Sequence, residues 1–359
     1  MSEADSEVTT AESAQEGTER APSNGVLLAA VGIVWMAAML WSARATITGR
    51  VDVEMEVTST AYAMPGAISA SLVAGAAVAL AVIAFLTRGG RAPSVTIRFI
   101  IATGAGLGIG LLGALSIVTI NTEGWLYAVV GGAVAAAATI GGALAGFRYP
   151  RVTAAVCWGA VTVFAVGFVL NYLQSPLLPV LGSGDTSASQ AAAASRFALA
   201  QSMLSGLGGA LVGYRVLRRA RRRSGDADVR WPLYALAGAG PGLLLLVGEV
   251  LTRTAGSRVL ELAGKVSELE LIVQQMLSGS RLNNGLIVLF VGAFTAMIAV
   301  GRTLGPAPEP AAEPVRAAEL GPAAEPEPAD DPEPADDPDE VKQAAPVAES
   351  QTVPARQDD

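Results

Sequence analysis

The residue types present in this chain restrict the chemistry that it could perform. The sequence of 359 residues contains no histidine and one cysteine, Cys157. This composition excludes a histidine base, Ser-His-Asp and Cys-His nucleophiles, histidine metal ligands and an intrachain disulfide. The three acids that come closest to forming a cluster are Asp52, Glu54 and Glu56. We expect them on the solvated face of a single predicted strand. We therefore predict a non-enzymatic protein that holds no metal and no cofactor.

Glu249 is the one acidic residue within a predicted membrane span, and the same span contains Gly240, Pro241 and Gly242. Intramembrane carboxylates are costly and often functional. Proline removes a helix hydrogen bond, and interrupted helices carry the substrate sites of many transporters. These four residues are thus a candidate transport site. The alternative is an ordinary proline kink, with Glu249 paired at i+4 to Arg253 near the outer interface, where an exposed pair contributes little.

An arginine-rich run follows another predicted span, and it could bind anions. It comprises Arg215, Arg218, Arg219, Arg221, Arg222 and Arg223. The run could bind anionic lipid headgroups or the acidic tail of the same chain. Setting the orientation of the protein in the membrane is by itself enough to explain the presence of this run. No aromatic residues interleave with the charges, so we expect no nucleic-acid partner.

The elements that must position these residues are membrane helices. Hydrophobic residues make up 52% of the chain, and the mean hydropathy is +0.46. A helical span needs about 20 apolar residues. The sequence predicts an all-α integral membrane bundle of about eight spans, at residues 25–42, 66–86, 97–120, 125–147, 152–174, 197–216, 232–252 and 284–303. The polytopic domain is thus residues 25–304, and the lipid bilayer is its first partner.

The two ends of the chain are acidic and polar. Residues 1–24 carry a net charge of −5 and residues 305–359 a net charge of −12, whereas residues 25–304 carry +9. The last segment contains 12 prolines and a tandem Pro-Glu-Pro-Ala-Asp-Asp repeat. Such segments bury too little apolar surface to offset chain entropy. We predict a disordered leader over 1–24 and a disordered cytoplasmic tail over 305–359.

The distribution of basic residues predicts the orientation. With eight spans, the loops on the side of the termini carry 13 arginines, and the opposite loops carry seven basic residues. Basic loops remain in the cytoplasm. We predict a multi-pass plasma membrane protein with both termini cytoplasmic and residues 253–283 outside.

Two outer segments have a regular pattern. Residues 46–60 alternate polar and apolar side chains, which predicts a strand-like loop. Residues 257–279 predict an outer amphipathic helix with an i,i+4 pair between Glu261 and Lys265. Its apolar stripe over residues 259–276 could form a homo-oligomer seam or pack on the bilayer or bundle. This stripe comprises Val259, Leu262, Val266, Leu269, Val273 and Met276.

Small residues four positions apart recur in the predicted spans. Such pairs allow helices to approach closely. We predict helix packing at Gly104, Gly106, Gly108, Gly110, Gly142, Gly146, Gly209 and Gly213. The pattern Gly-x-Gly-x-x-Gly at residues 108–113 is not a nucleotide loop, because no strand precedes it and it lies within a span.

Two functions remain compatible with these features. The first is an interaction or scaffold component of a membrane assembly, with an unidentified membrane or cytoplasmic protein partner. The alternative is a secondary transporter or permease for a small solute that uses the broken seventh helix. Residues 201–206 and 275–279 share the motif Met-Leu-Ser-Gly, which could reflect a parallel repeat of helical hairpins or chance.

Overall fold

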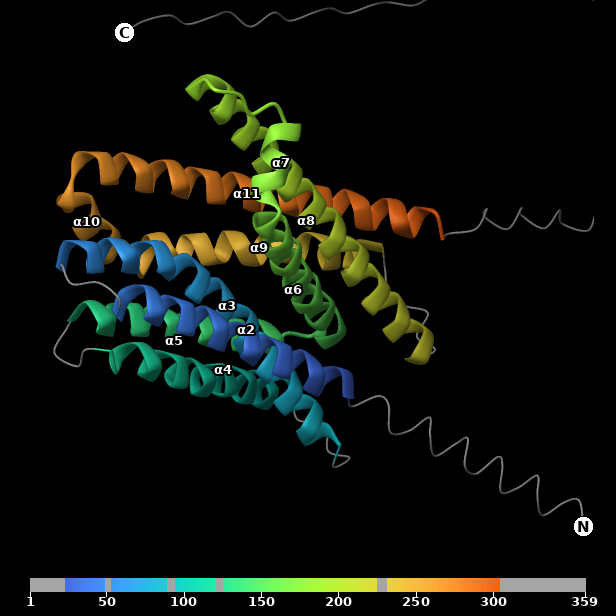
Figure 1. The fold of residues 1–359 in the computed structure, drawn as a ribbon. Helices are drawn as coiled ribbons and strands as arrows, with labels where there is room; N and C mark the ends of the chain where they lie inside the picture. The colour runs from blue at the N-terminus through green and yellow to red at the C-terminus, as the bar shows by residue number, and fades with distance from the viewer. Residues whose placement is uncertain (1–22, 49–52, 89–93, 121–124, 225–230, 304–359) are drawn as a thin grey trace, which may run out of the picture. The chain divides into compact units, whose positions relative to one another are not determined.

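The protein is helical throughout the part of the chain that its computed structural model describes, residues 23–48, 53–88, 94–120, 125–224 and 231–303 (Figure 1). The predicted all-α class is confirmed for these ranges. The predicted leader, apart from its last two residues, and all of the predicted tail lie outside them. The helices are α2 (Ser23–Thr48), α3 (Val53–Thr87), α4 (Val95–Val118), α5 (Trp125–Gly146), α6 (Pro150–Tyr172), α7 (Gln174–Val180), α8 (Ser187–Ser224), α9 (Trp231–Thr254), α10 (Ser257–Val266) and α11 (Glu268–Gly301).

Seven of the described helices are long and apolar enough to cross a membrane, namely α2, α3, α4, α5, α6, α9 and α11. The prediction of a multi-pass helical membrane protein is confirmed at this level. The predicted span 197–216 lies within α8, which is not among the seven. Polar residues and glycines lower the hydropathy of α8, so its crossing of the membrane belongs to the proposal below.

The predicted strand-like loop over residues 46–60 is wrong wherever the structure describes it. Helix α2 continues to Thr48, and α3 already begins at Val53. Extending an existing helix costs far less than nucleating a new element, so the spans carry their helical structure outward. The extension also places Glu56 where its carboxylate accepts a hydrogen bond from the hydroxyl of the buried Tyr127 of α5.

The predicted amphipathic helix over residues 257–279 is interrupted. Ser267 is extended (φ −158°, ψ 153°), and its side chain accepts a hydrogen bond from the backbone N–H of Glu270. Ser267 thereby ends α10 and caps the N-terminus of α11, whose first turn carries acidic residues that suit the helix dipole. The predicted ion pair of Glu261 and Lys265 is confirmed at 2.8 Å. Residues 259–276 therefore belong to two helices and do not form one continuous amphipathic helix.

The long helices share their main pairings in two consecutive sets of four. Helix α2 packs on α3, α4 packs on α5, and α3 contacts both α4 and α5. In the same order, α6 packs on α8, α9 packs on α11, and α8 contacts both α9 and α11. The sets differ in one contact, because α6 also packs on α9, whereas the corresponding helices α2 and α4 touch only slightly. We name these sets the N-terminal half (α2–α5) and the C-terminal half (α6, α8, α9 and α11). The pairing repeats after four long helices, not after the two of the hairpin repeat considered above.

Close glycine contacts occur in the corresponding helix pairs of the two halves. A Cβ atom on Gly106 of α4 would lie 2.8 Å from the Cα of Gly142 of α5. A Cβ atom on Gly292 of α11 would lie 3.0 Å from the carbonyl carbon of Gly238 of α9. Both distances are too short for a side chain, so these helix pairs have nearly touching backbones. The pairs α4–α5 and α9–α11 therefore correspond in packing as well as in order.

The predicted packing glycines divide by helix face. Within the described residues, no atom lies within 4 Å of a Cβ position on Gly104 or Gly108, so the predicted contact is wrong at both. They lie two residues from Gly106 and Gly110, about 200° around the helix, and only one of these faces can meet α5. The glycines that lie against neighbouring helices are Gly106, Gly110, Gly142, Gly146, Gly209 and Gly213.

Candidate functional site

Glu249 is buried in α9 at the centre of a polar cluster. Its side chain is 3% exposed. Arg253 Nε donates to Glu249 Oε1 at 3.0 Å, and Arg281 Nε donates to Oε2 at 2.8 Å. The hydroxyl of Ser278 donates to Oε1 as well. Both carboxylate oxygens are therefore engaged by charged or polar donors from α9 and α11.

Sequence reasoning found one of these three partners. Arg253 follows Glu249 by one helical turn, which is visible in the sequence. Arg281 and Ser278 belong to α11, which begins at Glu268, well before the predicted span 284–303. The signal that could have found them is the pattern Ser-x-x-Glu at residues 267–270, which marks a helix start.

The charges of the cluster do not cancel. One carboxylate faces two guanidinium groups, so the three side chains carry a net charge of +1. Arg253 is 43% exposed, and its Nη2 also donates to the carbonyl oxygen of Ser278 at 3.1 Å. Arg281 is less exposed, at 28%, and lines the cavity described next.

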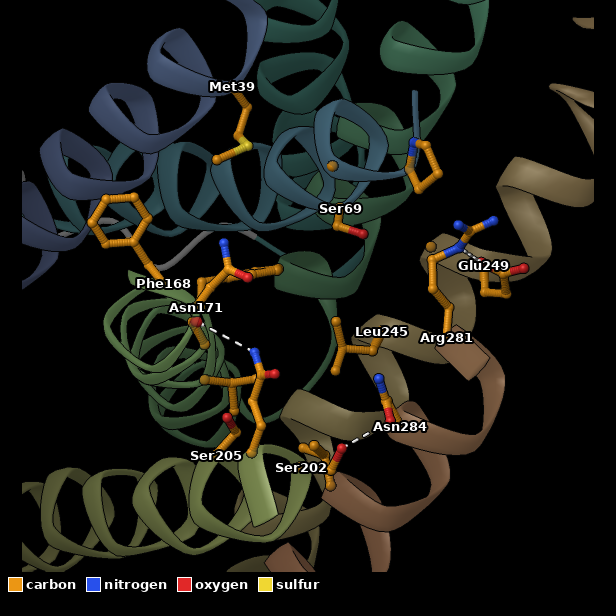
Figure 2. A pocket seen from close by; sticks show the side chains of 18 of the residues that line it. Met39, Ser69, Phe168, Asn171, Ser202, Ser205, Leu245, Glu249, Arg281 and Asn284 are labelled. Atoms are coloured by element: carbon orange, nitrogen blue, oxygen red, sulfur yellow. Dashed lines mark hydrogen bonds and ion pairs between the residues drawn. The ribbon is translucent and has the colours of Figure 1, made fainter. Parts of the chain in front are cut away.

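A cavity of about 400 Å³ lies between the two halves, beside Glu249 (Figure 2). We name it the interface cavity. Its lining comes from α2 and α3 of the N-terminal half and from α6, α8, α9 and α11 of the C-terminal half. The polar residues that line it are Ser69, Asn171, Gln201, Ser202, Ser205, Glu249, Arg281 and Asn284.

Hydrogen bonds fix several of these polar groups. Ser202 of α8 donates to Oδ1 of Asn284 of α11 at 2.8 Å. Gln201 Nε2 donates to the carbonyl oxygen of Gly167 of α6 at 3.3 Å. An apolar wall completes the cavity, where the rings of Trp35 and Phe164 stack with centroids 5.2 Å apart. The cavity thus combines hydrogen-bonding groups with an aromatic surface, as small-molecule sites do.

The seventh predicted span is not broken at Pro241. Helix α9 is continuous from Trp231 to Thr254, and its glycine-proline-glycine segment packs tightly on neighbouring helices. A Cβ atom on Gly159 of α6 would lie 2.7 Å from Cγ of Pro241, and one on Gly242 would collide with the backbone of Leu289 of α11. On its other side, Gly240 lies against Val156. The small residues therefore serve close packing, because neighbouring helices occupy the space that an open break would need.

The interface cavity ends before it reaches Pro241. A second, narrower void shares Ser69, Val163, Phe164 and Leu245 with the cavity and is bounded by Pro241, Leu244, Val73 and Ala160. It has no room for a water molecule. The structure therefore brings Glu249 to the cavity but separates it from Gly240, Pro241 and Gly242, which the sequence had grouped with it.

The arginine run at the end of α8 contributes to a different cavity. This space of about 210 Å³ is lined by Tyr214, Arg218, Arg221, Arg222, Tyr234, Val300 and Thr303. The guanidinium carbon of Arg218 lies 5.8 Å from the ring centroid of Tyr214, a cation–π distance. Arg215, Arg219 and Arg223 are exposed and do not line it. The run is thus divided between a pocket and the outer face of α8.

In the described ranges, no three His, Cys, Asp or Glu side chains gather in a way that could hold a metal ion. Comparisons of this chain with protein-family models, with curated proteins and with solved structures find no match. Among the described residues, the interface cavity is the feature that points to a function. What it can do chemically is bind a small solute through donors, amides and an aromatic wall.

Proposed function

We propose that this multi-pass membrane protein is a secondary transporter or permease that binds a small solute in the interface cavity. The observation that carries the proposal is the buried cluster of Glu249 and Arg281 beside a cavity of about 400 Å³ between two similarly paired halves. Ionisable groups are expensive in a membrane and are kept there where they serve a site or a solute path. A purely structural bundle has no need of this cavity.

The matching halves support the same function. Transporters built from parallel repeats place their substrate site at the interface between the repeats, and they work by rocking one repeat against the other. In this protein, the cavity draws on both halves, and its size lies within the range of small-molecule sites. In this scheme the helices on either side of the cavity move as two bodies.

The proposal includes α8 as an eighth span and the orientation predicted from the basic residues. The cavity would then open toward the outer side, since Asn171 and Glu249 lie near the outer ends of their predicted spans and Arg281 lies in the predicted outer segment 253–283. The narrow void bounded by Val73, Ala160, Pro241 and Leu244 would be the closure on the inner side. Transport requires this closure to open while the outer side closes.

A scaffold or interaction role is the second candidate, and one surface favours it. In the part of α11 that precedes the predicted span, Leu269, Ile272 and Met276 are 71%, 52% and 70% exposed. Exposed apolar patches of this kind often contact a partner. In this role the interface cavity would be static and would be reached from one side only.

Cysteine accessibility distinguishes the two candidates. The native thiol, Cys157, is 1% exposed and should remain unlabelled, so the unsubstituted chain is the control. Gln201→Cys places a thiol in the interface cavity. For a transporter, an impermeant methanethiosulfonate should label it in right-side-out vesicles and also in inverted vesicles. Labelling from one side alone, in folded protein, would contradict the transport proposal and favour the scaffold.

A further inference from the structure

Two residues that line the interface cavity each carry a buried hydrogen-bond donor without an acceptor. Among the described residues, the buried side-chain atoms without a partner are Trp35 Nε1, Thr103 Oγ1, Gln274 Oε1 and Arg281 Nη2. Of these four residues, Trp35 and Arg281 line the interface cavity. Both of their unpartnered atoms are N–H donors, and an unsatisfied buried donor is destabilising. A ligand that brings acceptor oxygens would satisfy either donor if its side chain turned toward the cavity.

The charge of the site favours the same kind of ligand. Glu249, Arg253 and Arg281 leave one positive charge uncompensated, as described above. The second guanidinium of the cluster, that of Arg253, is already engaged through Nη2 with the carbonyl of Ser278. Arg281 therefore remains the cation that can turn a free donor toward a solute. An added negative charge would neutralise a partly buried excess cation.

Among the described residues, the one carboxylate that lines the cavity is already occupied. Both oxygens of Glu249 accept from arginines, and Oδ1 of Asn284 accepts from Ser202. A cationic solute would have to displace an arginine from Glu249 to find a negative partner. The charge distribution therefore disfavours cations and favours anions.

The apolar part of the cavity lining indicates the chemistry of the uncharged part of the solute. Trp35 and Phe164 form a stacked aromatic pair, and Phe168 is 65% exposed on the same lining. Such a wall removes the apolar surface of a solute from water. The solute should therefore have a compact apolar body next to its charged group.

We propose that the interface cavity binds a monovalent organic carboxylate with an apolar body, held through Arg281. Its carboxylate accepts from the guanidinium group of Arg281, and its body lies against the ring pair of Trp35 and Phe164. This assignment of the substrate class depends on the proposed function for solute binding in the cavity, and it does not depend on whether the bound solute crosses the membrane.

Three probes of nearly equal shape test the class of solute. Phenylacetate, phenylacetamide and phenethylamine carry a negative, a neutral and a positive group on the same ring and chain. Thermal unfolding of the purified full-length protein in detergent is followed against the concentration of each. We expect phenylacetate to raise the unfolding temperature in a saturable way, with apparent affinity about tenfold or more above that of the other two.

Arg281→Gln and Arg253→Gln form a matched pair of variants. Each removes one guanidinium from Glu249, but only Arg281 lines the cavity. We expect Arg281→Gln to abolish the response to phenylacetate and Arg253→Gln to weaken it by no more than about threefold, as for loss of a more distant charge. If Arg281→Gln does not fold, Arg281→Lys keeps the charge without the planar fork and should still weaken binding.

The outcomes separate this inference from the transport proposal. Equal responses to the three probes, preference for phenethylamine, or no response to phenylacetate would each overturn the carboxylate assignment, whatever the labelling of Gln201→Cys shows. An Arg281-dependent response to phenylacetate together with one-sided labelling would support the assignment and contradict transport.

Discussion

At the scale of single residues, Glu249 is the position on which the fold and the site both depend. As a simple pair with Arg253 at the interface, it would contribute about 1 kcal/mol or less. The structure adds Arg281 and Ser278 as partners and buries the side chain to 3% exposure. Its contribution is therefore expected to exceed that of a surface pair.

Replacing Glu249 by Gln should cost about 2 kcal/mol of stability, because two guanidinium groups lose their anion while remaining partly solvated. Thermal and denaturant unfolding of the purified variant in detergent would measure this cost. Arg253→Gln is the control, since Arg253 is the more exposed partner, and it should cost less. A loss for Glu249→Gln no greater than that for Arg253→Gln would show that the buried contacts contribute little.

The chemistry of the site was only partly visible in the sequence. Glu249 is conspicuous because no other acid interrupts a predicted span, and Arg253 follows by one turn. Arg281 was assigned to an outer loop, because hydropathy marks where a span is apolar and not where its helix begins. The grouping of Pro241 with Glu249 was wrong because periodicity gives no information on which neighbour fills the space beside a proline.

At the scale of helices, the close packing of α4 on α5 predicts that glycine substitutions on the two faces of α4 have opposite effects on stability. Gly106→Ala should destabilise the protein by about 1–3 kcal/mol, because the new methyl group would lie against the backbone of α5. Gly104→Ala is the matched control on the open face of the same helix, and it should stabilise by about 0.5–1 kcal/mol through helix propensity. Thermal unfolding of both variants in detergent would measure the difference. Equal effects of the two substitutions would contradict the packing of α4.

At this scale, the sequence predicts where most spans lie but not where their helices end. Seven of the eight predicted spans coincide with long apolar helices, because long apolar runs leave few alternatives in a membrane. The ends of the helices were not predicted, since α3 and α11 each extend far beyond the apolar run of their span. Hydrogen bonds from side chains, which hydropathy does not detect, mark helix ends in this protein. Ser267 caps the start of α11. Arg98 caps the end of α5, because its Nη2 and Nε donate to the carbonyl oxygen of Gly146 at 3.0 Å and 3.1 Å. Arg98 had been assigned to orientation alone.

At the scale of the whole molecule, the two halves and the orientation make the topology testable. Ser257 lies exposed at the start of α10, and Gly301 is exposed at the end of α11. With both termini cytoplasmic, an impermeant maleimide should label Ser257→Cys in intact cells and should not label Gly301→Cys until the membrane is permeabilised. The buried Cys157 provides a silent background. Reversed labelling would invert the orientation and would place the interface cavity toward the cytoplasm.

The repeated pairing of helices could not have been predicted from one sequence. The short motif shared by residues 201–206 and 275–279 falls in α8 and α11, which belong to the same half. The correspondence between halves instead depends on which helices touch, as at Gly106 with Gly142 and at Gly238 with Gly292. Many small residues satisfy such contacts, so the sequences of two halves can diverge while their packing remains similar.

The polar face of α8 has a consequence for the synthesis of the protein. Ser202 finds its partner Asn284 in α11, which the ribosome makes more than 80 residues later. Until then α8 is a weakly hydrophobic segment, and the basic run at its end is what can retain that end in the cytoplasm during insertion.

A chain ended at residue 230 and fused to a fluorescent protein that folds only in the cytoplasm should be fluorescent. Replacing Arg218, Arg219, Arg221, Arg222 and Arg223 by Gln should abolish the signal, because α8 would then fail to insert. Persisting fluorescence would mean that the hydropathy of α8 is sufficient by itself.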